Sequence, residues 1–65
     1  MTFGEYVRAN GFTAKSLAEK AGVSVRTLEC YTTGRLPLKN SRAWLIVAVA
    51  EALGTTPKYL LTLDD

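Results

Sequence analysis

The chain has one cysteine, Cys30, and no histidine among its 65 residues. An internal disulfide is therefore excluded, and a metal site would lack the thiolate and imidazole ligands that zinc prefers. A phosphate-binding loop of the G-x-x-x-x-G-K type is also missing. We predict no metal, no cofactor and no enzymatic activity, because Cys30 has no evident base beside it and a cysteine on a helix is more often a small packing residue.

Long apolar runs are missing as well. The run 43–50 is too short to cross a bilayer, and no basic stretch leads into an apolar run at the N-terminus. With so little cysteine, this predicts a cytoplasmic protein without a membrane partner. The sequence is 48% apolar, which favours a folded core over a disordered tail. Its length fits one domain, residues 1–65.

The charge is unevenly distributed, although the net charge is only +2. Residues 25–42 contain four basic side chains and one acidic side chain, a local net charge of +3. Residues 43–65 contain one lysine and three acidic residues, a local net charge of −2. A polyanion is a natural partner for the basic segment. An ordinary solvated surface with scattered charges is the alternative.

The stretch 17–34, LAEKAGVSVRTLECYTTG, predicts two short helices joined by a tight turn. One apolar face of the first helix is made by Leu17, Ala18 and Ala21. Gly22 ends that helix because glycine adopts a positive φ without a Cβ penalty, and Val23 should point inward from the turn. Ser24 is a suitable N-cap for the second helix, which ends before Gly34.

The second of these helices has two distinct faces. Its inner face is made by Thr27, Leu28 and Tyr31. On the outer face, Arg26 and Glu29 are neighbours at i, i+3, beside Val25, Cys30 and Thr33. A row of donor, acceptor and small apolar groups is what a helix uses to read base edges in the major groove. A helical hairpin with a solvated outer face has the same spacing, so spacing alone leaves both interpretations open.

Capping signals predict further helices in the first half of the chain. Thr2 caps a helix that runs to about Asn10, where Asn-Gly is a stop and turn signal. Thr13 caps the next helix. A capping box is not expected there, because Ser16 replaces the usual Glu or Gln three residues after the cap.

After Gly34 the sequence predicts an extended loop over 35–40, because Pro37 disfavours a helical backbone at the residue before it. Asn40 or Ser41 is then expected to cap a longer helix over 42–53. This helix is apolar on more than one side, so it is either the central core helix or partly an interface.

Thr56 and Pro57 open a last short helix, 57–61, with proline at the first helical position. Trp44 has two interpretations: an interface anchor, since large aromatic residues are enriched at interfaces, or a lid over the core. The candidate interface residues are Trp44, Tyr59 and Leu63.

The stretch 17–34, the proline-bearing loop after it and AEALGTTPKYLL together resemble the Cro and lambda-repressor-type, or Xre-like, helix-turn-helix regulators. The resemblance covers residues 12–61 and rests on LAEKAGVS, the Leu28 and Tyr31 spacing, Gly34 and the pattern LG-x-x-P-x-x-L. It implies an all-α, compact bundle of about five short helices with a helix-turn-helix at about 13–34. Such proteins bind double-stranded DNA, commonly as a homodimer, and are bacterial or phage-encoded.

The resemblance also implies which side chains meet DNA. The base-reading positions are Val25, Arg26, Glu29 and Cys30. Arg26 would contact a guanine or a phosphate, Val25 a thymine methyl, and Glu29 a cytosine amine unless it only orients Arg26. The positions that contact the DNA backbone are Thr13, Lys15, Ser24, Thr33, Arg35, Lys39 and Arg42.

Two features depart from the family's pattern. The family often opens its second helix with a glutamine that touches DNA, but Ala14 stands here. It also often pairs a first-helix arginine with a glutamate near the end of the recognition helix, where this chain has Val7 and Thr32. Because both partners are replaced together, we expect uncharged packing between them.

Two functions are compatible with this sequence. The first is sequence-specific DNA binding by a dimeric transcriptional repressor that occludes its operator. The second is the same fold used as a protein–protein interaction module, since fold alone does not fix function. The small net charge, Ala14 and the apolar helix over 42–53 leave the second function open.

Overall fold

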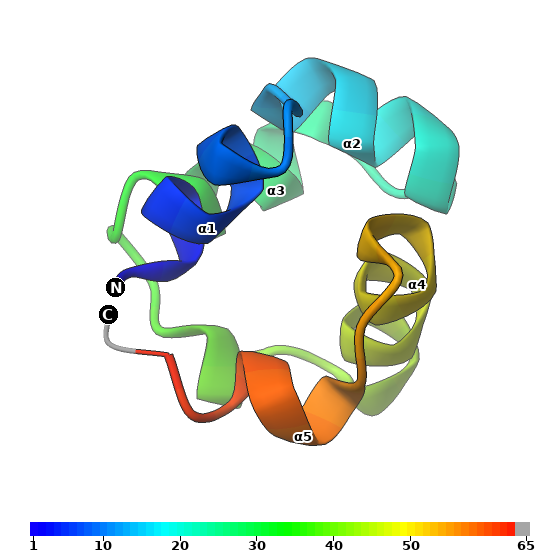
Figure 1. Cartoon of the computed structure of the whole chain (residues 1–65). Coiled ribbons are helices and arrows are strands. Elements are labelled where there is room, and N and C mark those ends of the chain that lie inside the picture. The colour runs from blue at the N-terminus through cyan, green and yellow to red at the C-terminus, as the bar shows by residue number, and fades with distance from the viewer. Residues whose placement is uncertain (64–65) are drawn as a thin grey trace.

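Helices dominate the computed structural model, which describes residues 1–63. The elements are α1 (Phe3–Ala9), α2 (Ala14–Ala21), α3 (Val25–Thr32), the short 3-10 helix η1 (Leu38–Asn40), α4 (Ala43–Leu53) and α5 (Pro57–Leu60) (Figure 1). The prediction of an all-α chain with about five short helices is confirmed for these residues. None of these helices is long and apolar enough to cross a membrane. Asp64 and Asp65, part of the acidic segment noted above, lie outside the described residues.

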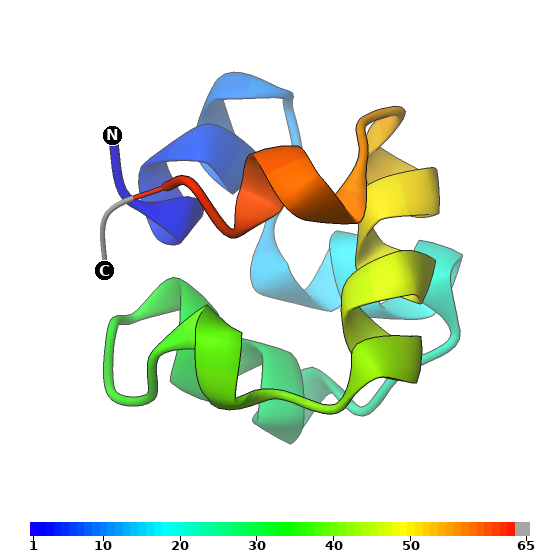
Figure 2. The same ribbon diagram turned by 90° about the horizontal axis from the view of Figure 1, so that it is seen from below.

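The helices pack around α4. α2 contacts both α3 and α4, α1 packs on α3, and α5 packs on α4. Figure 2 shows α5 lying between α1 and the C-terminal end of α4. The tilted rings of Tyr6 and Tyr59 meet there, with centroids 5.4 Å apart, and connect α1 to α5. α3 therefore lies on the side of the bundle away from α5, held by α1 and α2.

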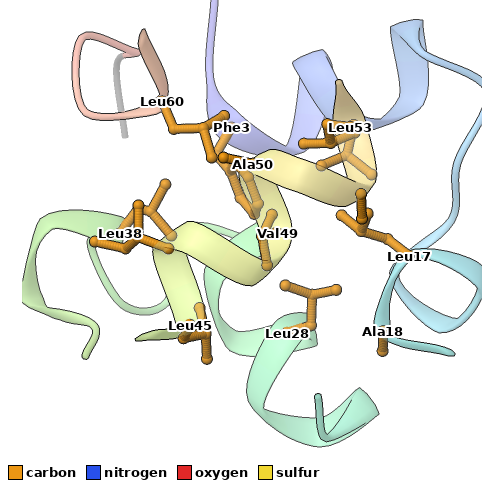
Figure 3. Packing of buried hydrophobic residues seen from close by; sticks show 13 residues of the cluster. Phe3, Leu17, Ala18, Leu28, Leu38, Leu45, Val49, Ala50, Leu53 and Leu60 are labelled. Carbon is orange, nitrogen blue, oxygen red and sulfur yellow. The ribbon is translucent and has the colours of Figure 1, made fainter. Parts of the chain in front are cut away.

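The core draws side chains from every helix, and Figure 3 shows them around α4. Its buried members are Phe3, Val7, Leu17, Ala18, Leu28, Leu38, Leu45, Ile46, Val49, Ala50, Ala52, Leu53 and Leu60. α4 is the central helix of this core, because its Leu45, Ile46, Val49, Ala50, Ala52 and Leu53 are all buried. This agrees with the apolar character of α4 on more than one side.

The predicted N-caps Thr2, Thr13, Ser24 and Thr56 all accept a hydrogen bond from a first-turn N–H. The prediction that α2 lacks a capping box is wrong. The Thr13 N–H donates to Ser16 Oγ at 2.9 Å, and the Ser16 N–H donates to Thr13 Oγ1 at 3.1 Å. A serine hydroxyl can thus replace the glutamate carboxylate of the usual box, because it also accepts a hydrogen bond.

The segment before α4 differs from the prediction. Leu38–Asn40 form the 3-10 helix η1 rather than extended loop, and α4 begins after Arg42, not after Asn40 or Ser41. The Ser41 N–H donates to the Leu38 carbonyl at 2.9 Å and the Ser41 hydroxyl donates to the same carbonyl at 2.6 Å, so Ser41 belongs to the 3-10 turn, and α4 begins after Arg42 without a side-chain cap. Burial of Leu38 stabilises this turn. α5 ends at Leu60, one residue earlier than predicted.

α1 and α3 meet at an uncharged contact. Val7 is buried in the core and Thr32 is half-buried. Gly4 is also buried and lies against the backbone carbonyl of Thr32. The absence of a side chain at Gly4 lets the two backbones approach closely.

Candidate nucleic-acid interface

The turn between α2 and α3 sets the orientation of α3. Gly22 has a φ of 74°, in the left-handed region, and ends α2. The Val23 N–H donates to the Ala18 carbonyl at 3.0 Å, while the Val23 side chain packs against the core. Leu28 is fully buried, so it fixes α3 on the bundle and leaves the opposite face of α3 in solvent. The predictions for Gly22 and Val23 are confirmed.

The outer face of α3 carries a shallow hollow of about 310 Å³. It is lined by Arg26, Glu29, Cys30, Thr33 and Arg35. The structure thus brings three of the predicted base-reading residues together with two of the predicted backbone-contacting residues. Val25 lies apart from them, half-buried and packed partly against the core, so only part of its side chain is accessible. Cys30 is a free, half-buried thiol.

The hydroxyls predicted to contact the DNA backbone differ in whether their proton is free to form a hydrogen bond with a phosphate. The Thr33 hydroxyl donates to the Glu29 carbonyl at 2.7 Å, and the Thr13 hydroxyl to Ser16 Oγ at 3.2 Å. Phosphate oxygens only accept hydrogen bonds, so these two hydroxyls would have to break an internal bond to reach a phosphate. Ser24 Oγ, by contrast, accepts from the Thr27 N–H at 3.5 Å and keeps its own proton to donate.

A second hollow lies between α1, the start of α2 and the end of α3. Arg8 lines it together with Thr13, Ala14, Glu29 and Thr33. Sequence analysis missed Arg8, because the resemblance places no DNA contact at this position. The sequence does place Arg8 two residues before Asn10-Gly11, and the turn at Asn10-Gly11 brings the end of α1 beside the start of α2. Arg8 adds an exposed guanidinium next to the outer face of α3.

A third hollow, of about 200 Å³, lies between the starts of α3 and α4. It brings together Ser24 and Arg42, both predicted to contact the DNA backbone, with Thr27, Tyr31 and Trp44. Lys15 and Lys39 are exposed but line none of the three hollows.

The three candidate interface residues do not form one patch. Trp44 is 58% exposed and stands in the first turn of α4. Tyr59 stands in α5, beyond the other end of α4, and its ring packs on Tyr6. Leu63 is half-buried against the core. Because α4 has 11 residues, Trp44 and Tyr59 lie near opposite ends of an element about 16 Å long.

Comparisons with protein-family models, curated proteins and solved structures find no match for this chain. Within residues 1–63, no three His, Cys, Asp or Glu side chains gather in a way that could hold a metal ion. The hollows around α3 offer cations, hydroxyls, the Cys30 thiol and the Glu29 carboxylate.

Proposed function

We propose that the chain binds double-stranded DNA in a sequence-specific way, with α2 and α3 as a helix-turn-helix and α3 as the recognition helix. The observation that carries this proposal is the outer row of α3. Arg26 and Glu29 are exposed on it, while Leu28 on the opposite side is fully buried and fixes the helix in place. A rigidly held helix with outward donor and acceptor groups is what base reading requires.

The dimensions and charges of this surface suit a major groove. An α-helix with its side chains is about 10–12 Å across, and the major groove is about 12 Å wide, so α3 with its eight residues can enter it. Arg26 would donate to the O6 and N7 of a guanine, and Glu29 would accept from a cytosine amine or orient Arg26. The guanidinium groups of Arg8, Arg35 and Arg42 surround α3 and would neutralise phosphates along the groove.

The same proposal includes a homodimer on a two-fold operator and repression by occlusion of polymerase, in the cytoplasm of a bacterium or of a phage-infected cell. This follows the resemblance to Cro and lambda-repressor-type regulators. In such dimers the two recognition helices meet half-sites about one DNA turn apart.

A protein–protein interaction module is the second candidate. The observation in its favour is the set of exposed large apolar side chains, which includes Trp44, Val47 and Leu61 at 58%, 43% and 49% exposure. Exposed apolar groups that are contiguous mark interaction sites, whereas single ones are common on any protein. Trp44 stands in α4 and Leu61 directly follows α5, so of these three residues only Trp44 and Val47 are neighbours on one helix face.

A salt titration separates the two functions. The anisotropy of a dye-labelled random duplex reports binding, and the same titration on a single strand of equal length is the control. For a DNA-binding protein the affinity should fall steeply as salt rises, with a slope that corresponds to about 4 to 6 phosphates per monomer. If no duplex binds at low salt, DNA binding is wrong and the protein-interaction function takes its place.

Selection of binding sites from a random duplex pool tests the finer part of the proposal. A dimer should enrich two inverted half-sites at a fixed spacing. Enrichment of one unrepeated half-site would contradict the dimer while leaving DNA binding intact.

A further inference from the structure

The hollow at the start of α4 has a distinctive set of side chains. It is lined by the exposed Trp44, by Arg42, by the hydroxyl-bearing residues Ser24, Thr27 and Tyr31, and by Leu45. Within residues 1–63, no hydrogen bond or ion pair uses the Tyr31 hydroxyl, the Trp44 indole N–H or the Arg42 guanidinium. Several residues with unused hydrogen-bond donors therefore line one small space.

We propose that this hollow binds the sugar-phosphate backbone of duplex DNA and that Trp44 is one of its contact residues. The inference rests on the proposed DNA binding and adds to it a residue that neither reads bases nor carries charge. Phosphate oxygens accept hydrogen bonds only, and the Trp44 indole, the hydroxyls and Arg42 can all donate to them. The flat indole also offers an apolar surface to the adjacent deoxyribose.

Charge distinguishes this hollow from its neighbours. The hollow at Arg26 and the hollow at Arg8 both include the Glu29 carboxylate, which offsets part of the positive charge of their arginines. The hollow at Trp44 is lined by no carboxylate, and Arg42 is its charged member. Its local charge is therefore complementary to a polyanion, whereas an apolar protein partner would leave Arg42 and three hydroxyls to be desolvated.

The position of the hollow relative to α3 supports the same occupant. Ser24, Thr27 and Tyr31 follow one flank of α3, whereas Glu29, Thr32 and Thr33 line the Arg8 hollow on the other flank. The outer row with Arg26 runs between these flanks, opposite the buried Leu28. A helix inserted in a major groove has one DNA strand on each side, so the Trp44 hollow and the Arg8 hollow would face the two strands.

The chain allows a direct test because Trp44 is its only tryptophan. The probe is a random duplex of about 20 base pairs, two turns long. Intrinsic fluorescence reports the environment of Trp44, while the anisotropy of a labelled duplex independently reports binding. We expect the tryptophan emission to change along the same binding curve as the anisotropy. A dilution series without DNA should leave the emission constant.

Variants supply the energetic test. Trp44→Ala should weaken binding to all duplexes alike, by about 3- to 10-fold, the value of one or two net hydrogen bonds. The slope against salt should stay unchanged, because an uncharged contact releases no counterion. Val47→Ala is the matched control: Val47 is also exposed on α4 and lies outside the hollow, so it should bind as the wild type does. Trp44→Phe should keep the apolar contact with the deoxyribose and lose the N–H donor, with an intermediate affinity.

The outcomes separate this inference from the function on which it rests. Duplex binding with unchanged Trp44 emission, or with Trp44→Ala equal to Val47→Ala, would overturn the Trp44 contact and leave DNA binding standing. An emission that changes with protein concentration alone would place Trp44 in a protein interface and overturn the contact. If no duplex binds by anisotropy, the proposed function and the Trp44 contact both fail. Circular dichroism of Trp44→Ala checks that the exposed substitution leaves the helices intact.

Discussion

Gly4 of α1 lies against the Thr32 carbonyl of α3, and a Cβ atom at position 4 would overlap that carbonyl oxygen. The obstacle is backbone rather than a flexible side chain, so it cannot turn aside. This contact is where the first helix is seated on the proposed recognition helix. The identity of residue 4 therefore affects the position of α3 on the bundle.

Gly4→Ala should lower the free energy of unfolding by about 1–3 kcal/mol, because the added methyl forces the two helices apart. Helix propensity alone predicts the opposite sign, a gain of up to about 1 kcal/mol when alanine replaces a helical glycine. Urea denaturation followed by circular dichroism decides between them. Ala9→Gly, at an exposed position of the same helix, is the control and should lose only the propensity term. A stabilised Gly4→Ala protein would show that the helices separate at no cost.

Leu28→Ala tests the anchor of α3. Leu28 is fully buried in the core, and its truncation should cost about 2–5 kcal/mol, a large part of the stability of so small a domain. Thermal denaturation by circular dichroism measures the loss. Loss of DNA binding in this variant would follow from unfolding and carry no information on recognition. It therefore shows how a binding variant behaves when its defect is one of folding. A stability equal to the wild type would contradict the assigned core.

The helices were largely predictable from local signals. The expected N-caps form at Thr2, Thr13, Ser24 and Thr56. A Ser or Thr hydroxyl just before a segment of helical periodicity accepts a hydrogen bond from a free N–H of the first turn, so these residues are strongly preferred as N-caps. The segment 38–41 was not predictable in this way. The Ser41 hydroxyl donates to the Leu38 carbonyl, and Leu38 is buried in a core formed by residues distant in the sequence, so the 3-10 turn depends on tertiary packing.

The candidate site was predictable only in part. The outer row of α3 follows from helical periodicity, so Arg26, Glu29, Cys30 and Thr33 are together as expected. The placement of Arg8 and Trp44 beside α3 depends on how α1 and α4 pack against it, and that is tertiary information. Likewise, the partial burial of Val25 depends on the neighbouring core rather than on its position in the helix.

Arg26 and Lys39 should contribute to DNA binding in different ways. Arg26→Ala should lose about 1–3 kcal/mol on a selected site and relax specificity at one position, because a bidentate arginine discriminates guanine. Lys39→Ala should weaken all duplexes alike and reduce the salt slope by about 1, as for a phosphate contact. Competition between a selected and a random duplex measures both. If Arg26→Ala loses equally on both duplexes, Arg26 contacts phosphate and not a base.

The capping box at the N-terminus should make stability depend on pH. The Thr2 N–H donates to Glu5 Oε1 at 2.8 Å, and hydrogen bonds from Thr2 lower the pKa of Glu5 in the folded chain. The unfolded chain therefore takes up this proton at a higher pH than the folded one. The Glu5 contribution is complete above about pH 5 and is lost as the pH falls through the lowered pKa. Urea denaturation from neutral to acidic pH should show the wild type and Glu5→Gln converging in acid. A constant difference would contradict the charge-dependent cap.

Arg8 should act as a phosphate contact that the sequence resemblance does not indicate. It shares a hollow with Thr13, Thr32 and Thr33, whose hydroxyl protons are already donated within the protein, so among the described side chains that line this hollow Arg8 is the one with donors left for a phosphate. Arg8→Ala should weaken every duplex alike and reduce the salt slope by about 1. Arg8→Lys should keep the slope, since it keeps the charge.

Lys58→Ala is the matched control for Arg8→Ala, because Lys58 is also an exposed cation but stands on α5 and lines none of the hollows around α3. It removes the same unit of net charge from the chain. If Arg8 and Lys58 variants lose the same affinity, the effect is one of total charge, and the Arg8 flank does not face DNA. If Arg8→Ala lowers the affinity and Lys58→Ala does not, the Arg8 flank faces DNA. If Trp44→Ala also lowers the affinity, both flanks of α3 face DNA, as expected for a helix bordered by the two strands of one major groove.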